Sequence, residues 1–265
     1  MSAVVWADID RDVVIVEGDD AAAFLHSQLA NDIASLAAGK SIQSLLLEPT
    51  GQVTALVRVT RHSDTVFTLD VEAGLGASLI TRLQRFVLRA KVVMRVSDWA
   101  VRAFRGDNAV AAVGQGPGRA VPYWGGTDAV DVIGEVSDLP IIGEETEVPH
   151  IDMYRVEAQW PRVGLDILVG DIPATTGVVG VAVSFSKGCY PGQELVERMD
   201  SRGANAPVRV VALSRDGIGV GARLQADGKD VGTVTSIGFT RALARVARGA
   251  SIGVELSPPE STNSH

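Results

Sequence analysis

Lys187-Gly-Cys-Tyr-Pro-Gly-Gln-Glu194 contains the only cysteine of the chain and leads into a predicted helix. Its proline suits the first turn of a helix, where a backbone N–H has no partner within the helix and its absence costs nothing. Glu194 and Arg198 have the i,i+4 spacing of a helical ion pair. A thiol just before a helix and two residues from a lysine is where a thiolate is stabilised. Cys189 therefore has two interpretations: a reactive thiol activated by Lys187, or a small buried hydrophobic side chain.

Composition narrows the class of protein. The 265 residues are 46% hydrophobic, which supplies a full core, and they carry a formal net charge of −8. An acidic chain of this kind is not a general nucleic-acid-binding protein, so we expect no direct DNA binding. The overall negative charge still allows a local basic pocket. No run reaches the ~18–20 apolar residues of a membrane span, and the N-terminus lacks the basic and apolar regions of a signal peptide. We expect a cytoplasmic protein without membrane contact.

A single cysteine limits the redox and metal chemistry of the chain. It excludes an intrachain disulfide framework and fits a reducing compartment. It also excludes a self-contained cysteine-ligated iron–sulfur or zinc site, which needs about three or four protein ligands. The histidines show no metal-ligand spacing. Gly114-Gln-Gly-Pro-Gly118 is not a dinucleotide-binding loop, because Arg119 stands where the fingerprint needs glycine. We therefore expect no resident metal site.

Strands and helices are both expected along the first 205 residues. Short apolar runs predict strands, and longer segments with apolar residues on one side predict helices. Glu48-Pro-Thr-Gly51 supplies the turn residues of a hairpin. The predicted helices are 21–29, 75–89 and 148–159, and the predicted strands are 13–16, 45–47, 53–59, 66–71, 91–96, 100–104, 110–113, 130–133 and 181–185.

The texture of the sequence changes after Ala204. Short apolar runs at 208–213, 221–225, 231–236 and 242–246 are separated by glycines, and this spacing predicts a small β-barrel or sandwich. We assign residues 206–257 to this C-terminal domain and residues 258–265 to a disordered polar tail. Residues 1–205 form the first region, which we expect to contain two lobes with a boundary near 100–150.

Two segments carry side chains suited to ligand binding. In Tyr154-Arg-Val-Glu157-Ala-Gln-Trp160, the glutamate near the end of a helix can accept paired N–H donors from a heterocycle with a guanine-like or pterin edge. Farther along, Arg198 and Arg202 lie four residues apart and can hold a carboxylate tail. The alternative is that these residues form ordinary surface ion pairs, such as Glu194 with Arg198, which contribute little.

Together these segments resemble the folate-binding YgfZ-type proteins, relatives of the aminomethyltransferase (T-protein) of the glycine cleavage system. The resemblance is most specific at residues 187–194, followed by Arg198 and Arg202-Gly-Ala-Asn. It extends in the same order to segments 16–32, 46–53, 155–166 and 232–236, and so covers most of the chain.

The resemblance implies an α+β fold: two interleaved ferredoxin-like α+β lobes around a central folate pocket, plus a small C-terminal β-barrel. The implied ligand is tetrahydrofolate or a one-carbon derivative of it. Glu157 matches the family's pterin-contacting glutamate, and Arg198 or Arg202 would contact the glutamyl tail. The full set of implied folate-binding residues is Tyr154, Glu157, Trp160, Tyr190, Gln193, Glu194, Arg198 and Arg202.

One position departs from the aminomethyltransferase pattern. There, the hairpin after Gly51 carries an aspartate that assists the folate nitrogen, whereas Ala55 or Leu56 stands at that point in this chain. General acid–base catalysis needs a titratable group within hydrogen-bond reach, so aminomethyltransferase activity is not expected. The resemblance instead implies an accessory protein that binds tetrahydrofolate and supports iron–sulfur cluster assembly or repair in client enzymes, some of which modify tRNA.

In that function Cys189 would be the working thiol, with Lys187 as its activator. A single thiolate cannot hold a cluster, so iron–sulfur client or assembly proteins would supply the other ligands. Two alternatives stay open. One is a folate-dependent one-carbon transferase or demethylase that uses Asp166 or Glu194 as its acid. The other is a folate-sensing binding module without a reactive thiol.

Overall fold

Three five-stranded sheets and six α-helices make up the described part of this computed structural model, which comprises residues 3–114, 116, 118–120, 128–201 and 206–257. The mixed α+β class expected from the sequence is confirmed. In the described residues, no helix combines the length and apolarity that crossing a bilayer requires.

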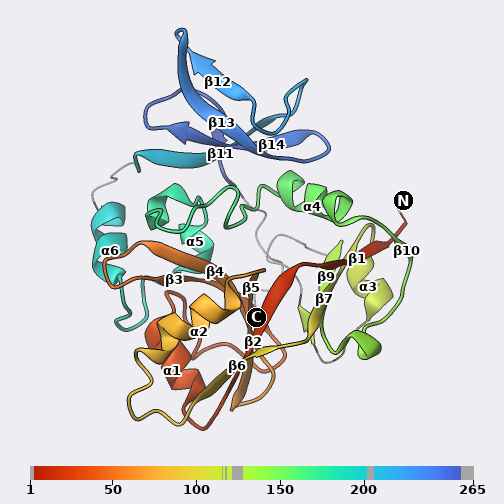
Figure 1. Cartoon of the computed structure of the whole chain (residues 1–265), viewed down its shortest axis with the longest axis vertical. Helices are drawn as coiled ribbons and strands as arrows, with labels where there is room; N and C mark the ends of the chain where they lie inside the picture. The colour runs from red at the N-terminus through yellow and green to blue at the C-terminus, as the bar shows by residue number, and fades with distance from the viewer. Residues whose placement is uncertain (1–2, 115, 117, 121–127, 202–205, 258–265) are drawn as a thin grey trace.

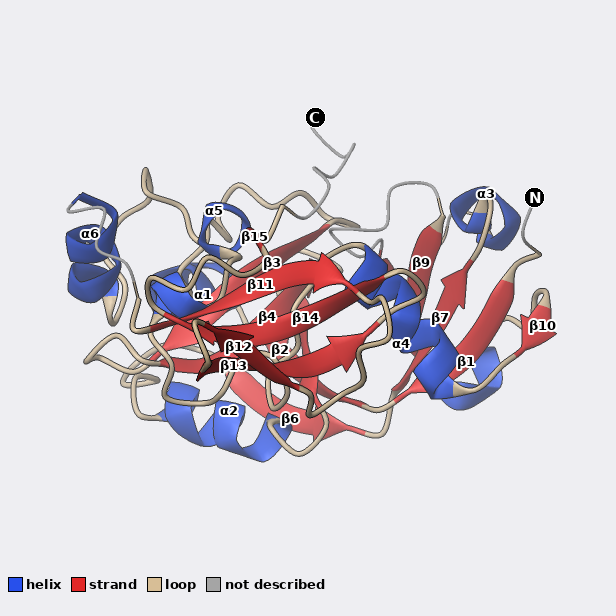
Figure 2. Cartoon of the chain, turned by 90° about the horizontal axis from the view of Figure 1, so that it is seen from above, coloured by secondary structure: helices blue, strands red, loops and turns tan. Residues whose placement is uncertain are grey.

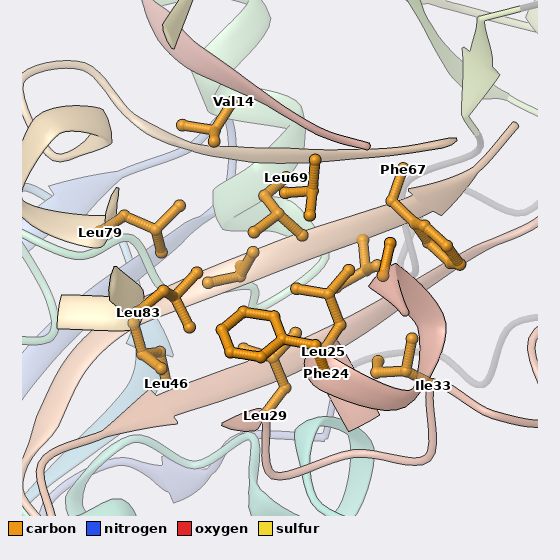
Figure 3. Packing of buried hydrophobic residues seen from close by; sticks show 14 of the residues in the cluster. Val14, Phe24, Leu25, Leu29, Ile33, Leu46, Phe67, Leu69, Leu79 and Leu83 are labelled. Carbon is orange, nitrogen blue, oxygen red and sulfur yellow. The ribbon is translucent and has the colours of Figure 1, made fainter. Parts of the chain in front are cut away.

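The first sheet is formed by consecutive apolar runs in the order β3-β4-β5-β2-β6. Helices α1 (Ala21–Gln28) and α2 (Gly76–Gln84) pack against one face of it, and their Leu25 and Leu83 are fully buried there (Figure 3). Each such side chain contributes about 1.5–3 kcal/mol by leaving water. The strands are β2 (Arg11–Glu17), β3 (Ser41–Leu47), β4 (Val53–Arg61), β5 (Val66–Glu72) and β6 (Val93–Ser97).

The second sheet is interleaved with the first. Strand β1 lies in the second sheet and β2 in the first, with only Asp10 between them, so the chain crosses from one sheet to the other at that residue (Figure 1). Helices α3 (Ala109–Val113) and α4 (Val148–Glu157) contact strands of this sheet. Its order is β10-β1-β7-β9-β8, formed by β1 (Val5–Ile9), β7 (Ala100–Arg105), β8 (Arg119–Ala120), β9 (Ala129–Gly134) and β10 (Glu144–Glu145).

The third sheet is antiparallel and belongs to the C-terminal region. Figure 1 shows it above a layer that contains α4, α5 (Val179–Ala182) and the loops beside them. The four strands predicted after residue 204 are confirmed, and closure into a barrel stays a prediction. The order is β12-β13-β14-β11-β15, formed by β11 (Val208–Ser214), β12 (Arg223–Ala226), β13 (Lys229–Ile237), β14 (Arg241–Ala247) and β15 (Val254–Glu255).

The remaining elements are short. Two single-turn 3-10 helices are η1 (Val136–Asp138) and η2 (Pro173–Thr175). Helix α6 (Gln193–Ser201) lies at one end of the molecule, with α3 and β10 at the other (Figure 2). The predicted tail at 258–265 lies outside the described residues.

Four local predictions were wrong. The apolar runs 110–113 and 181–185 were expected to be strands. Helix α3 contains the first run, and the second run starts inside helix α5, which ends at Ala182. Runs this short carry no periodicity that separates a buried strand from a helical turn. The helix predicted over 75–89 ends at Gln84, because Leu88 is 90% exposed and adds no burial that would extend it. Helix α6 begins at Gln193, after the proline that was expected in its first turn.

Candidate functional site

A cavity of about 390 Å³ lies where the first two sheets meet α4. This volume falls within the range of small-molecule sites, roughly 300–1,000 Å³. Asp10, at the crossing between the sheets, is part of its wall. We call it the central cavity. Its lining residues are Ile9, Asp10, Arg11, Gln43, Leu56, Arg58, Glu72, Ala73, Arg105, Asp131, Val148, Ile151, Asp152, Arg155, Trp160, Arg162, Val163, Gly164 and Leu165.

A buried ionic network joins the two sheets at this wall. Arg58 from β4 donates to Asp70 through Nε at 2.8 Å and to Asp131 through Nη1 at 2.5 Å. Arg105 from β7 donates to the same Asp131 at 2.8 Å. Burial alone would favour the neutral acid, but Arg105 and Arg58 outweigh it and hold the pKa of Asp131 below its ordinary value. The network therefore stays charged and ties the second sheet to the first.

A second group of charges comes from α4 and the loop that follows it. Arg155 Nε donates to Asp152 at 2.7 Å, and Arg162 Nη1 donates to Asp152 at 3.2 Å. Arg162 also lies 3.8 Å from Glu72, which in turn accepts from Arg11 at 2.9 Å. Despite partial burial, Arg155 and Arg162 keep the pKa of Asp152 below its ordinary value. This side of the cavity thus presents both guanidiniums and carboxylates.

Two lining residues differ from these paired charges. Leu56 faces the cavity, whereas Ala55 is buried in the core beneath α1 and α2, as the alternation of side chains along β4 requires. The position discussed for the transfer acid is therefore apolar at the cavity wall. Asp10 is exposed, and within the described residues its carboxylate makes no hydrogen bond or ion pair.

Of the described residues implied for folate binding, Trp160 is the one that lines the central cavity. Its carbonyl accepts from Arg155 Nη1 at 2.5 Å, which fixes the start of the loop. Tyr154 lies on another side of α4, where its ring meets those of His150 and Phe239 edge-on, with centroids 5.8 and 5.1 Å away. Sequence reasoning thus placed one member of the set at this cavity.

Glu157 hydrogen-bonds to the turn between β13 and β14. Its Oε1 accepts from the backbone N–H groups of Thr240 at 2.5 Å and Arg241 at 3.1 Å, and Oε2 accepts from the Thr240 hydroxyl at 2.7 Å. Partial burial favours the neutral acid, but these hydrogen bonds outweigh it and hold the pKa of Glu157 below its ordinary value. The carboxylate therefore anchors the turn between β13 and β14, and Glu157 is not among the residues that line the central cavity.

Lys187 is also engaged away from the cysteine. Its ammonium donates to the carbonyls of His26 and Leu29, the latter at 2.6 Å, at the C-terminal end of α1. Cations are favoured there because the last carbonyls of a helix lack partners. Burial lowers the pKa of Lys187 to about 8. The ring of Tyr190 lies 5.1 Å from Nζ and is itself buried in the core. The lysine therefore attaches the segment 187–194 to the C-terminal end of α1.

Cys189 is exposed, so its interpretation as a buried hydrophobic residue was wrong. In the part of the chain that the structure describes, its thiol forms no hydrogen bond, to Lys187 or to any other residue. It lines neither the central cavity nor a second cavity beside α6. The thiol is thus presented to solvent, and its activation by Lys187 stays a prediction without a contact to support it.

Two glycines bring this loop against the β3–β4 hairpin. Gly192 has φ +86°, and a Cβ there would lie 2.7 Å from the carbonyl oxygen of Glu48. Gly51 has φ +95°, and its Cβ would lie 2.5 Å from that of Leu195. Both positions need a residue that tolerates positive φ and has no side chain. The hairpin and the cysteine loop are therefore a single packed unit.

The other implied folate contacts lie along α6. Gln193 donates to Glu197 at 2.5 Å and accepts from the backbone of Tyr190 at 3.3 Å. Glu194 lies 4.0 Å from Arg198, with both side chains exposed, so the surface ion pair considered as an alternative is present. Arg202 lies outside the described residues. The described side chains of α6 do not line the central cavity.

Arg155 and Arg162 lie in the segment 155–166 that carried the resemblance, but the charged lining residues of the strands were missed because they are scattered along the sequence. Arg58 and Asp131, for example, are 73 positions apart. One available signal was a charged residue inside an apolar strand, such as Asp131 in Val130-Asp-Val132, because buried charges are rare unless they are paired. No described cluster of three or more His, Cys, Asp or Glu side chains is placed to hold a metal ion.

Comparison with known proteins agrees with this architecture. No family model matches the chain. It is 26% identical to the tRNA-modifying protein YgfZ of Photobacterium profundum and 25% identical to that of Vibrio atlanticus, over 74% of this chain and 65% of each relative. This chain is a relative of the YgfZ proteins. The resemblance expected from the sequence is confirmed, and the chain spans about two thirds of the length of these YgfZ proteins.

Two further comparisons extend this relationship. An uncharacterized protein of Haemophilus influenzae is 26% identical, over 84% of this chain and 80% of that protein. The glycine cleavage system aminomethyltransferase T from Bartonella henselae superposes with a TM-score of 0.78 over 95% of this chain and 80% of its own. At 20% identity, this likeness shows that the YgfZ relative has the aminomethyltransferase fold.

Proposed function

We propose that this YgfZ relative binds tetrahydrofolate, or a one-carbon derivative of it, in the central cavity as an accessory protein. It would support assembly or repair of iron–sulfur clusters in client enzymes, including enzymes that modify tRNA. The names of the YgfZ relatives and the shared aminomethyltransferase fold support this role. The observation that carries it is a charged cavity in which the apolar Leu56 takes the place of a transfer acid.

The chemistry of the cavity wall fits a folate. A pterin ring presents adjacent N–H donors, and carboxylates such as Asp152 and Glu72 retain acceptor positions for them. The glutamyl tail is anionic, and Arg11 and Arg162 are guanidiniums that suit a carboxylate. Trp160 supplies apolar surface for an aromatic ring. These five residues line the cavity and would hold the ligand.

The proposed role separates binding from transfer. Leu56 cannot donate or accept a proton. Asp166 is fully buried and already accepts from Arg155, Thr235 and the backbone of Arg162, as well as from a serine hydroxyl. Neither Asp166 nor the exposed Glu194 lines the cavity. The acids named for a one-carbon transferase are therefore not placed to serve it.

Asp10 keeps the enzymatic alternative testable. Its carboxylate lines the cavity and has no ion-pair partner within the described residues. An enzyme that transfers or releases a one-carbon group here would use Asp10, and Asp10→Asn would abolish its turnover of methylene-tetrahydrofolate. The accessory role predicts that neither the wild type nor Asp10→Asn turns over methylene-tetrahydrofolate. The change in folate absorbance measures this turnover.

The exposed thiol suits an accessory protein. Cys189 lies outside the central cavity and is open to a macromolecule at the surface. One thiolate supplies one of the several ligands that a cluster needs, so the client would supply the rest. In cells lacking the wild-type protein, Cys189→Ala should fail to restore iron–sulfur enzyme activity. Full rescue by that variant would show that the thiol is not needed, and the protein would then be a folate-binding module without a reactive cysteine.

Calorimetric titration with tetrahydrofolate tests the binding half of the proposal. Arg162 lines the cavity and is one-third exposed, so Arg162→Ala should fold and bind at least about ten-fold more weakly, the loss expected for one charge-assisted hydrogen bond. Arg198→Ala removes a guanidinium from α6 and should leave the affinity unchanged. Equal affinity of wild type and Arg162→Ala would contradict the assignment of the cavity.

A further inference from the structure

A second cavity, of about 560 Å³, lies between α6 and the third sheet. It is formed by η2, α5, α6 and the third sheet, and it shares no lining residue with the central cavity. The lining residues are Pro173, Ala174, Thr175, Gly177, Val179, Gly180, Val196, Met199, Ala206, Arg209, Val210, Arg248, Gly249, Ala250, Ser251, Glu255 and Leu256.

One part of this cavity is apolar. Val196 of α6 and Val210 of β11 are buried in the same hydrophobic cluster, with Val179 and Leu256 packed against it. Pro173 adds a rigid apolar ring. Such a wall favours a ligand with an apolar or aromatic body, because burial of that body releases water from both surfaces. A free inorganic ion would leave this wall unused.

Another part of the cavity is positively charged. Arg209 donates to the carbonyl of Ala250 at 2.8 Å and lies 3.8 Å from Glu255. Arg248 is exposed, and its guanidinium forms no hydrogen bond or ion pair with any residue that the structure describes. Two guanidiniums and one carboxylate leave this cavity positive on a chain whose net charge is −8. A guanidinium fork suits the oxygens of a phosphate or a carboxylate.

Two glycines leave the cavity open. A Cβ added at Gly180 or at Gly249 would meet no atom of the described residues within 4 Å, so both positions have space beside them. Gly249 has φ +80°, which disfavours a side chain for conformational reasons. Gly180 is in α5 and has no positive φ, so a side chain can be added there to fill the space.

We propose that the second cavity binds a small ligand that joins an anionic oxygen group, a phosphate or a carboxylate, to an aromatic or apolar body. Arg248 and Arg209 would contact the anionic group, and the wall of Val179, Val196 and Val210 would cover the body. This site is separate from the proposed folate site, so the two can succeed or fail independently.

A matched pair of probes tests the two parts of the proposal. In calorimetric titrations of the whole chain, 1-naphthyl phosphate should bind, and neutral 1-naphthol, which has the same aromatic body, should bind at least about ten-fold more weakly. Titration with 1-naphthoate tells a phosphate preference from a carboxylate preference. Equal binding of 1-naphthol and the two anions, or no binding of either anion at millimolar concentration, would overturn the proposal.

Three variants locate the binding. Arg248→Gln should bring the affinity for 1-naphthyl phosphate close to that for 1-naphthol, and Gly180→Leu should abolish binding of both. Gly219→Leu is the control, because Gly219 also has open space and no positive φ but lies in neither cavity. Undiminished binding to a folded Gly180→Leu would place the probe elsewhere and refute the site. Because Arg248 is exposed, Arg248→Gln decides the matter if the leucine variant does not fold.

Discussion

Charged side chains from several strands and one helix form the wall of the central cavity, whereas backbone contacts and glycines hold the cysteine loop of residues 187–194. In the cavity wall, Arg58 and Asp131 face each other across the two sheets. In the loop, Lys187 bonds to backbone carbonyls and Gly192 touches the hairpin. The difference teaches that the proposed ligand site depends on the fold as a whole, whereas the position of the thiol depends on a few local contacts.

The largest effect should come from breaking the ionic network. Arg58→Met leaves Asp70 and Asp131 without a shared buried partner, which should lower the free energy of unfolding by about 3–5 kcal/mol. Arg223→Met removes an exposed ion pair to Asp230 at 3.5 Å and should cost less than about 1 kcal/mol. Urea unfolding followed by circular dichroism measures both. Equal losses would mean that the network is not the link between the sheets.

A smaller effect is expected where the loop meets the hairpin. Gly192→Ala places a methyl group against the carbonyl of Glu48 at positive φ, and should cost about 1–3 kcal/mol. Gly188→Ala, in the same loop but with open space and no positive φ, should cost about 0.5 kcal/mol or less. The rate of Cys189 modification by a disulfide reagent should change only in Gly192→Ala. An unchanged rate in both variants would show that hairpin docking does not control access to the thiol.

Glu157 allows a test that distinguishes anchoring from ligand binding. Glu157→Gln weakens its bonds to Thr240 and Arg241, and should destabilise the β13–β14 turn by about 1–2 kcal/mol, with faster hydrogen exchange of those two amides. Because the pKa of Glu157 is lowered on folding, its contribution is present above the unfolded pKa and is lost as the pH falls through the folded one. The affinity for tetrahydrofolate should stay the same. A large loss of affinity would return Glu157 to the folate site.

The smallest effect concerns the buried ammonium of Lys187. A folded pKa of about 8 lies below the unfolded value, so between pH 8 and 9.5 the unfolded chain binds more protons and stability rises with pH. Lys187→Met removes this group. Between pH 8 and 9.5, the free energy of unfolding of the wild type should therefore rise by up to about 1 kcal/mol more than that of the variant, as measured by urea titrations. Parallel curves would show that the lysine is not buried against α1.

The sequence was most informative where structure is local. Apolar runs bounded by turn residues predicted the strands of the first sheet and all strands of the third except β15, and the hairpin at residues 48–51 was expected from its own turn residues. Strand β1 was not predicted, and the run at 110–113 was placed in the wrong class of element. Each has too few residues to show a period, and burial by distant parts of the chain decides its conformation.

The candidate site was predicted less well for a related reason. Lys187 and Glu157 were predicted to be site residues, and in the structure they contact the end of α1 and the β13–β14 turn, which sequence spacing does not indicate. Strand pairing in the second sheet brings Arg105 near Asp131, and the meeting of the two sheets brings Arg58 to the same Asp131. The central cavity is defined by the assembled sheets together with α4 and the loop that follows it.

The one-residue crossing at Asp10 has a consequence for synthesis. Strand β1 leaves the ribosome first, but it pairs with β7, in a register that joins Ile9 to Val101 and Val5 to Arg105. The strands of the first sheet are all translated by Ser97, so this sheet can form while β1 still has no partner. An unpaired apolar strand is exposed to association with other chains during that interval. Strand β1 (Val5–Ile9) is therefore a segment of the nascent chain that needs protection until β7 has been synthesised.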